Sequence, residues 1–325
     1  MRALALFSGG LDSLLAMKLV KDQNIDILAV YIDTGFGSKN EKIDQLKKSC
    51  LSIDVPLKVL DIKKDFLDEV LFDPKYGYGK NFNPCIDCHG FMFKHTKKLL
   101  KLYDASFMIS GEVLGQRPMS QRKEAIGQVA KLSGDEDDII VRPLSAKLLN
   151  ITKPERLGWI DREKLLDIEG RSRARQLKLV EQFNITHFES PSGGCLLTDM
   201  SFSQRLAEFV KYDKLETNDI DTLKVGRHFR LENKAKLIIG RNQDDNIKME
   251  KITNPKYLKF VVQDVPGPLC MIEKKANMQD KQVASKIAIT YAKTKPNQSY
   301  QTTIDETTFS DTKFENKDLV HRYII

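Results

Sequence analysis

The first thirteen residues constrain the fold more than any other stretch of this chain. An apolar run at residues 3–7 has the length of a buried strand, two glycines break it, and residues 12–17 continue with helical spacing. A strand, a glycine turn and a helix start in this order leave backbone N–H groups unpaired and open to a ligand. Ser8 and Ser13 add hydroxyl groups. The stretch therefore predicts an anion site, most simply one for a phosphate.

Asp12 suggests that a metal ion accompanies this phosphate, because a carboxylate repels an anion unless a divalent cation lies between them. The order Ser-Gly-Gly-Leu-Asp-Ser at residues 8–13 resembles the PP-loop of ATP pyrophosphatases, which adenylate an oxygen and release pyrophosphate. It is not a Walker loop, because no Lys-Ser or Lys-Thr follows the glycines. The alternative is an ordinary capped helix. The resemblance implies ATP and Mg²⁺, bound by Ser8, Gly9, Gly10, Asp12 and Ser13.

The composition indicates how many domains the chain has, in which compartment it works and what chemistry its cysteines perform. A chain of 325 residues with 41% hydrophobic content can bury a large core and favours two domains. No apolar stretch approaches a membrane span and no signal peptide is recognisable, so we expect a cytoplasmic protein without membrane contact. Five cysteines, with one close pair, indicate thiol or metal chemistry rather than a disulfide framework.

Five apolar runs separated by helical stretches predict an α/β domain with a parallel five-stranded sheet, of the HUP type that the resemblance implies, with helices on both faces. The carboxyl ends of such strands line one crevice, where ligands bind. In the PP-loop superfamily, residues at the end of the second strand contact adenosine, which points to Tyr31 and Asp33. Gly111 and Arg117 follow the fourth strand, where a glycine and an arginine suit a phosphate. The runs are residues 3–7, 27–32, 57–62, 107–112 and 139–144.

A cysteine pair follows a stretch at residues 72–84 whose prolines and glycines predict an irregular loop. Cys85 and Cys88 open a predicted helix on one face, where the helix dipole lowers thiol pKa and favours thiolates. Residues 83–94 resemble the Asn-Pro-x-x-x-Cys-Asn…Lys-Phe motif of the tRNA 2-thiouridylases, with Cys88 at the conserved cysteine. Bacterial members commonly have Asp where Cys85 stands, and His89 replaces the usual Asn.

Cys195 stands behind two glycines, on backbone that exposes it. It resembles the second thiouridylase cysteine, which carries the sulfur to be transferred. The resemblance implies Asp12, Cys88 and Cys195 as catalytic residues, and a persulfide on Cys195 that Cys88 resolves. The additional Cys85 favours a second version, in which Cys85, Cys88 and Cys195 hold a [4Fe–4S] cluster with one open iron for sulfide. A structural zinc site is the third alternative.

The last third of the chain changes character. Short strands at residues 223–252 with a turn at 244–246, a hairpin at 257–273 and a helix at 281–292 predict a small α+β domain. Its glycine turns weakly resemble the RNA-binding domain of the NFACT proteins. Residues 201–325 hold 22 Lys and Arg against 17 Asp and Glu, which is either a polyanion-binding surface or a solvated one.

We therefore expect a catalytic domain at residues 1–190, a cysteine-bearing linker and helix at 191–212, and an RNA-binding domain at 213–325. Two helices are predicted at 153–168 and 172–183. An arginine-rich start to the second of these offers a contact for the tRNA backbone.

The resemblance implies a tRNA sulfurtransferase that adenylates a uridine carbonyl oxygen with ATP and then replaces AMP with sulfur. Its partners would be tRNA and a sulfur donor, either a protein or sulfide. A catalytically inactive nucleotide-binding, RNA-associated module is one alternative, and a PP-loop ligase that adenylates a small carboxylate is another. The ligase would need neither the cysteines nor the basic C-terminal part.

Overall fold

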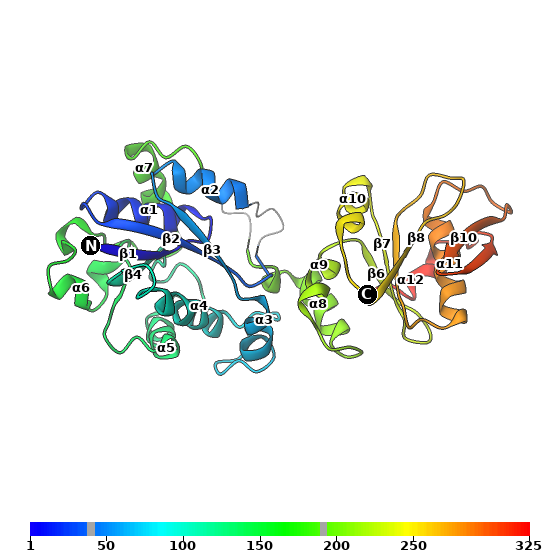
Figure 1. Ribbon diagram of the computed structural model, residues 1–325, viewed down its shortest axis with the longest axis horizontal. Helices are drawn as coiled ribbons and strands as arrows, with labels where there is room; N and C mark the ends of the chain where they lie inside the picture. Colours follow the sequence, from blue (N-terminus) through cyan, green and yellow to red (C-terminus); the bar gives the residue numbers. More distant parts are fainter. Residues whose placement is uncertain (38–42, 189–193) are drawn as a thin grey trace. The chain divides into compact units, whose positions relative to one another are not determined.

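The computed structural model describes residues 1–37, 43–188 and 194–325. It divides the chain into two compact units, Met1–Asp199 and Met200–Ile325 (Figure 1). Within the described ranges, no helix has both the length and the apolar character needed to span a membrane.

A five-stranded parallel sheet forms the centre of the first unit, which confirms the predicted fold class. The strands lie in the order β3-β2-β1-β4-β5, so the chain moves outward from β1 to β3 and then returns past β1 to β4. The strand order therefore reverses between β1 and β4, which is where open α/β sheets bind their ligands. The strands are β1 (Arg2–Leu6), β2 (Asp26–Asp33), β3 (Leu57–Asp61), β4 (Phe107–Ser110) and β5 (Ile140–Val141).

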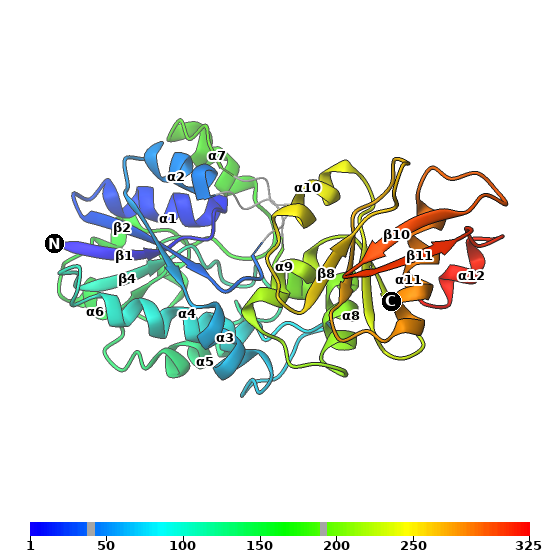
Figure 2. The same cartoon turned by 45° about the vertical axis from the view of Figure 1, so that its right-hand side comes forward.

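Helices cover both faces of this sheet (Figures 1 and 2). On one face α1 (Leu11–Lys21) packs against α7 (Ala174–Gln182), with α2 (Ile43–Leu51) beside β3. On the other face α4 (Cys85–Leu99) packs along α5 (Lys123–Ser133). The shorter turns are α3 (Lys63–Phe66), η1 (Leu67–Leu71), η2 (Ala146–Leu148), α6 (Lys153–Arg156), η3 (Arg162–Lys164) and η4 (Leu196–Thr198).

The continuous helix predicted at residues 153–168 is wrong. It stops after one turn at α6, because Gly158 adopts a left-handed φ of +66° that a helix cannot continue through. Asp161 then starts a separate turn, η3, by accepting a hydrogen bond from the Glu163 backbone.

The second unit is built on a four-stranded antiparallel sheet in the order β6-β7-β9-β8, with a separate hairpin of β10 and β11. The predicted hairpin at residues 257–273 is confirmed, because β8 and β9 pair there. The elements are α8 (Met200–Phe209), α9 (Thr217–Lys224), β6 (Arg227–Arg230), β7 (Lys236–Ile239), α10 (Gln243–Lys251), β8 (Tyr257–Phe260), β9 (Cys270–Glu273), α11 (Met278–Tyr291), β10 (Tyr300–Ile304), β11 (Thr307–Asp311) and α12 (Asp318–His321).

The turn predicted at residues 244–246 is wrong, because these residues form the first turn of α10. The Asn242 side chain caps the helix by accepting from the Asp245 backbone N–H at 2.9 Å. The acidic residues that resemble a turn therefore complement the positive end of a helix dipole.

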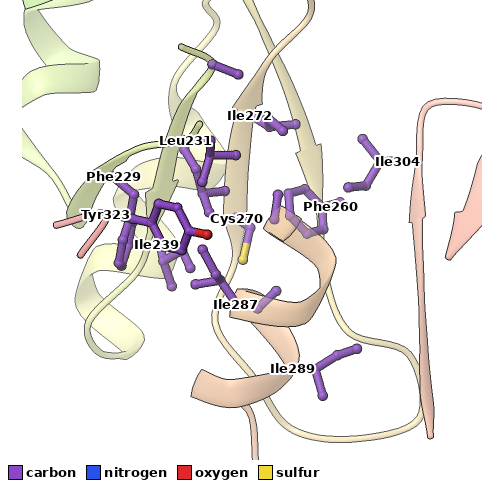
Figure 3. Packing of buried hydrophobic residues seen from close by; sticks show 14 of the residues in the cluster. Phe229, Leu231, Ile239, Phe260, Cys270, Ile272, Ile287, Ile289, Ile304 and Tyr323 are labelled. Atoms are coloured by element: carbon purple, nitrogen blue, oxygen red, sulfur yellow. The ribbon is translucent and has the colours of Figure 1, made fainter. Parts of the chain in front are cut away.

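Alternate residues of the β-strands pack on opposite faces of the second sheet. Leu237, Ile239, Cys270 and Ile272 join the larger core, together with Ile287 from α11 (Figure 3). Their sequence neighbours on the same strands join a smaller core on the other face. Cys270 is fully buried in the larger core, as expected for a core thiol, and burial raises its pKa.

Candidate active site

The loop between β1 and α1 forms one half of the site. Gly9 has a φ of +84°, and Gly10 stands at the N-cap of α1 without a capping side chain in the part of the chain that the structure describes. Ser13 is buried and donates its hydroxyl to the Gly10 carbonyl at 2.8 Å, while Ser8 is exposed. The first N–H groups of α1 are therefore left for a ligand.

Gly111 brings the end of β4 against this loop. A Cβ atom at Gly111 would lie 2.4 Å from the Ser13 backbone nitrogen and 2.6 Å from the Asp12 carbonyl carbon. Such an approach is impossible for any side chain, so Gly111 fixes the distance between β4 and the start of α1.

Asp12 is held by a short chain of buried amides. Its Oδ2 accepts from Gln116 Nε2 at 2.6 Å, and the Oε1 of Gln116 accepts from Gln176 Nε2 at 3.0 Å. The Arg173 guanidinium lies 4.0 Å from Oδ2. The Oδ1 of Asp12 is buried without a hydrogen-bond partner among the described residues. A carboxylate fixed by one oxygen with the other unsatisfied fits a Mg²⁺ ligand.

Sequence reasoning missed Gln116 and Gln176. It considered Arg173 only as part of an arginine-rich RNA contact. In the structure Arg173 reaches Asp12, while Arg175 pairs with Asp167 at 2.6 Å. The only signal in the sequence is that Gln116 directly precedes Arg117, and nothing in the sequence singles out Gln176, which is the one buried residue of α7.

Tyr31 and Asp33 end β2 beside this loop. Tyr31 is buried, and Asp33 accepts from the Gly35 backbone at 2.8 Å and pairs with Lys63 at 2.7 Å. Burial by itself lowers the pKa of Lys63, but Asp33 and Asp61 outweigh it and hold the pKa above its ordinary value. The lysine thus joins the carboxyl ends of β2 and β3.

The irregular loop at residues 72–84 forms the other half, and its anchors lie around the start of α4. Asp87 is buried and accepts from the backbone N–H groups of Lys75, at 2.8 Å, and Tyr76, at 3.0 Å. Asn83 accepts from the Asn81 backbone at 3.0 Å and donates to Cys85 Sγ at 3.1 Å. These hydrogen bonds fix the position of the first turn of α4 and of the two cysteines on it.

The Cys195 segment reaches the same place from a distant part of the sequence. Leu196 donates its backbone N–H to the Phe36 carbonyl at 2.9 Å, and Asn81 Nδ2 donates to the Thr198 carbonyl at 2.7 Å. Cys195 itself is exposed. Of the motif predicted around it, residues 191–193 lie outside the described residues.

The three cysteines act on one another electrostatically. Burial raises the pKa of Cys88 well above its ordinary value, and Cys195, Cys85 and Asp87 raise it further. Burial also raises the pKa of Cys85, although the Asn83 amide and the Arg117 guanidinium oppose this. The predicted thiolates at the helix start are therefore wrong for this conformation, because desolvation outweighs the helix dipole.

A metal site at these cysteines gains no support from the geometry. In residues 1–37, 43–188 and 194–325, no group of three or more His, Cys, Asp or Glu is arranged to hold a metal ion. We therefore derive no step through an iron–sulfur cluster or a zinc ion.

A buried charged cluster that the sequence did not predict adjoins Cys88 through the next residue, His89. Glu112 follows β4 and accepts from Arg142 Nε at 2.8 Å, with His89 Nδ1 also at 2.8 Å. Burial raises the pKa of Glu112, but Arg142 and His89 outweigh it and bring the pKa down to about 2. The carboxylate thus holds the histidine that adjoins Cys88.

The loop that follows β4 connects the two halves of the site. Gln116 donates to Asp12, and the next residue, Arg117, is exposed and lowers the pKa of Cys85. The Arg117 backbone is held by Gln121 Oε1 at 3.0 Å. The β1–α1 loop and the cysteines therefore interact with two consecutive residues, Gln116 and Arg117.

Comparison with known proteins finds similarity in both units of the chain. Residues 1–125 match the family model described as the tRNA methyl transferase HUP domain, and residues 226–323 match the NFACT protein RNA binding domain. The tRNA-specific 2-thiouridylase MnmA of Lactobacillus johnsonii is 22% identical, over 68% of this chain and 59% of its own length. MnmA of Francisella tularensis is 24% identical, over 68% and 61%. The chain thus spans about three fifths of the length of these relatives.

A crystal structure of a 4-thiouridine synthetase–RNA complex with bound ATP is 21% identical, covers 56% of this chain and 50% of its own, and has a TM-score of 0.36. The first unit carries an HUP domain of the class found in PP-loop enzymes. The chain thus resembles tRNA-specific 2-thiouridylases, and its residues 226–323 resemble the NFACT protein RNA binding domain.

Proposed function

We propose that the protein transfers sulfur to a uridine of tRNA, after ATP has adenylated the uridine carbonyl oxygen. The observation that carries the proposal is the loop after β4, where Gln116 donates to Asp12 and Met119 contacts Asn83, the side chain that donates to Cys85. Adenylation takes place at the carbonyl oxygen and sulfur delivery at the carbon that bears it, so the loop that binds ATP and the cysteines must lie close together. The names of the relatives, tRNA-specific 2-thiouridylases, support the same chemistry.

In this proposal the backbone N–H groups behind Ser8, Gly9 and Gly10 bind the phosphates of ATP, and Ser13 keeps the turn in shape. Tyr31 and Asp33 would contact the adenosine, and Gly111 and Arg117 would lie at the phosphates of ATP or of the substrate. The unpaired Oδ1 of Asp12 would hold Mg²⁺, which supplies positive charge against the leaving pyrophosphate. Gln116 and Gln176 keep that carboxylate oriented.

Sulfur transfer then follows from the cysteines. A persulfide on Cys195 attacks the adenylated carbon with its terminal sulfur, and AMP leaves with the electron pair of the C–O bond. Cys88, after losing its proton, attacks the Cys195 sulfur and releases the thiocarbonyl product. The two electrons that reduce the transferred sulfur come from the cysteines, which end as a disulfide. An external dithiol reductant restores them, and a sulfur-donor protein or sulfide with an oxidant reloads the persulfide.

The second unit would bind the tRNA. Its match to an NFACT RNA binding domain and the excess of basic residues at 201–325 support this role. We assign catalysis to residues 1–190, the presentation of Cys195 to 191–212 and RNA binding to 213–325, in a cytoplasmic protein.

The test is a pyrophosphate-release and thiolation assay with tRNA, ATP and a persulfide donor, read by nucleoside mass spectrometry. Asp12→Asn should abolish both pyrophosphate release and thiolation. Cys195→Ala should abolish thiolation while tRNA-dependent pyrophosphate release continues. Cys50→Ala, which removes a buried thiol of α2 far from any motif, should leave both intact. Pyrophosphate release by Asp12→Asn at the normal rate would refute the assignment of the loop.

The remaining alternatives give different results in the same assay. A ligase would release pyrophosphate with a small carboxylate and no tRNA, and an inactive module would release none. Suppose that the parent protein contains iron, and that both iron and activity are lost in Cys85→Ala, Cys88→Ala and Cys195→Ala. That result would show that an iron–sulfur cluster, and not a persulfide, delivers the sulfur. Full activity of metal-free protein and of Cys85→Ala would exclude the cluster.

A further inference from the structure

The loop at residues 72–82 presents aromatic rings to solvent. Phe72 and Tyr78 are 44% and 40% exposed, respectively. Both rings contact Phe82, with centroid distances of 6.0 Å from Phe72 and 4.9 Å from Tyr78. Aromatic side chains are usually buried more completely, and a contiguous exposed group of them marks an interaction surface.

Hydrogen bonds hold this loop in place although it has no regular secondary structure. The Tyr78 hydroxyl donates to the Leu71 carbonyl at 2.7 Å, and the Gly79 N–H donates to the Asn83 carbonyl at 3.0 Å. The buried Asp87 carboxylate holds the backbone of Lys75 and Tyr76. The rings are therefore presented by a backbone that is already ordered, which reduces the entropy lost when a ligand binds.

The charge of the loop favours an anionic polymer. Lys75 and Lys80 are exposed, and neither has an ion-pair partner among the residues that the structure describes. Asp73 is the opposing charge within the loop. Lys94, on the neighbouring helix, is occupied by Glu69 at 3.2 Å. Exposed aromatic rings with lysines between them are typical of surfaces that bind single-stranded nucleic acid.

The loop also ends at the cysteines. Asn81 binds the Thr198 carbonyl in the Cys195 segment, and Asn83 donates to Cys85 Sγ. A base that stacks on Tyr78 or Phe72 would therefore lie within a few nucleotides of a uridine placed at the cysteines.

We propose that residues 72–82 form a stacking platform for an unpaired base that flanks the modified uridine, with Lys75 and Lys80 against the adjacent phosphates. The assignment of this RNA as substrate rests on the proposed function, but the binding itself does not. The platform makes the protein selective for single-stranded RNA, because the bases of an A-form duplex offer no free face to an aromatic ring.

The test uses the full chain and a single-stranded 12-nucleotide RNA that carries one 2-aminopurine, with the same sequence in a duplex as comparison. Stacking on a ring changes the 2-aminopurine emission, and anisotropy of an end-labelled copy gives the affinity. Both are measured without ATP. We expect the single strand to bind more tightly than the duplex and the emission to change only with the single strand.

Four variants test the rings. Tyr78→Ala and Phe72→Leu should each weaken single-strand binding about 5-fold or more and reduce the emission change. Phe72→Leu keeps an apolar contact with Phe82, so a loss there is a loss of stacking. Tyr78→Phe keeps the ring and should bind within about 2-fold of the parent, since only the bond to Leu71 is lost. Leu102→Ala removes a 71% exposed apolar side chain of the same unit outside the loop and should change nothing.

Unchanged affinity and emission in Tyr78→Ala and Phe72→Leu, with thermal unfolding as in the parent, would refute the platform. Equal losses in the Leu102→Ala control would do the same. If the rings bind RNA as expected but no tRNA is thiolated, the proposed function fails and the platform stands. If tRNA is thiolated and the ring variants keep the parent's KM for tRNA, the platform fails and the function stands.

Discussion

The buried Glu112 should contribute a large share of the stability of the first unit. Its pKa falls from an ordinary value of 4.5 to about 2 in the folded protein. A depressed carboxylate pKa stabilises the fold at pH values above the unfolded pKa, and a shift of this size corresponds to about 3 kcal/mol. Because the pKa of Glu112 is lower in the folded than in the unfolded protein, its stabilisation of the fold is complete near pH 7 and is lost as the pH falls through about 4.5 toward 2.

Glu112→Gln removes the charge and leaves Arg142 without its partner in the interior, where the arginine is only 7% exposed. Breaking a buried ion pair from one side costs about 3 to 5 kcal/mol. We therefore expect the variant to be less stable by that amount near pH 7. Because the parent loses part of its carboxylate contribution on acidification, the difference should shrink by about 1 kcal/mol at pH 3.5.

The assay is urea unfolding followed by the fluorescence of Trp159, the only tryptophan, which packs against Phe107 in the first unit at a centroid distance of 6.3 Å. The matched control is Glu69→Gln, which removes a carboxylate that is 52% exposed and paired with Lys94. That change should cost less than about 1 kcal/mol. Equal effects of the two substitutions, or a Glu112→Gln difference that stays constant from pH 7 to about pH 3.5, would refute the reasoning.

Two glycine substitutions test close approaches elsewhere. Gly111→Ala should weaken ATP binding about 10-fold or more by calorimetry, because its Cβ would collide with the backbone of Asp12 and Ser13. Gly127→Ala in α5, where nothing lies within 4 Å, should bind ATP normally, and equal affinities in the two variants would contradict the prediction. Gly240→Ala should destabilise the second unit by about 1 to 3 kcal/mol, because its Cβ would displace the Asn246 side chain that accepts from the Leu269 backbone at 3.1 Å. A calorimetric scan in which Gly240→Ala unfolds at the same temperature as the parent would contradict this prediction.

Local patterns in the sequence were sufficient to predict the sheet and the glycine turn between β1 and α1. The β1 strand is a continuous apolar run because parallel strands are buried on both faces, and two glycines separate it from α1. The same local reasoning failed at residues 244–246, where Asn242 and Asp245 suit both a turn and a helix start. Only the docking of α10, which buries Met249, decides between the two.

The candidate site could be predicted only as separate pieces. Each motif cysteine could be predicted from its flanking residues. The amides that orient Asp12 could not, because they come from the β4–α5 loop and from α7, far apart in the sequence. Glutamines carry no local signature, since their role is set by a partner about a hundred residues away. The contacts among Asp12, Gln116 and Gln176 exist only because the strand order brings β4 beside β1.

The pKa of the cysteines shows why a correct motif gave an incorrect protonation state. A helix start favours a thiolate, and that argument treats Cys85 and Cys88 as exposed. In the fold, Asp87 ties the loop over the start of α4, and the burial that results raises both thiol pKa values. Cys195 remains exposed. In the proposed reaction, the exposed Cys195 would therefore receive sulfur from a donor, while the half-buried Cys88, whose pKa is raised, would stay protonated until it is needed to resolve the bond.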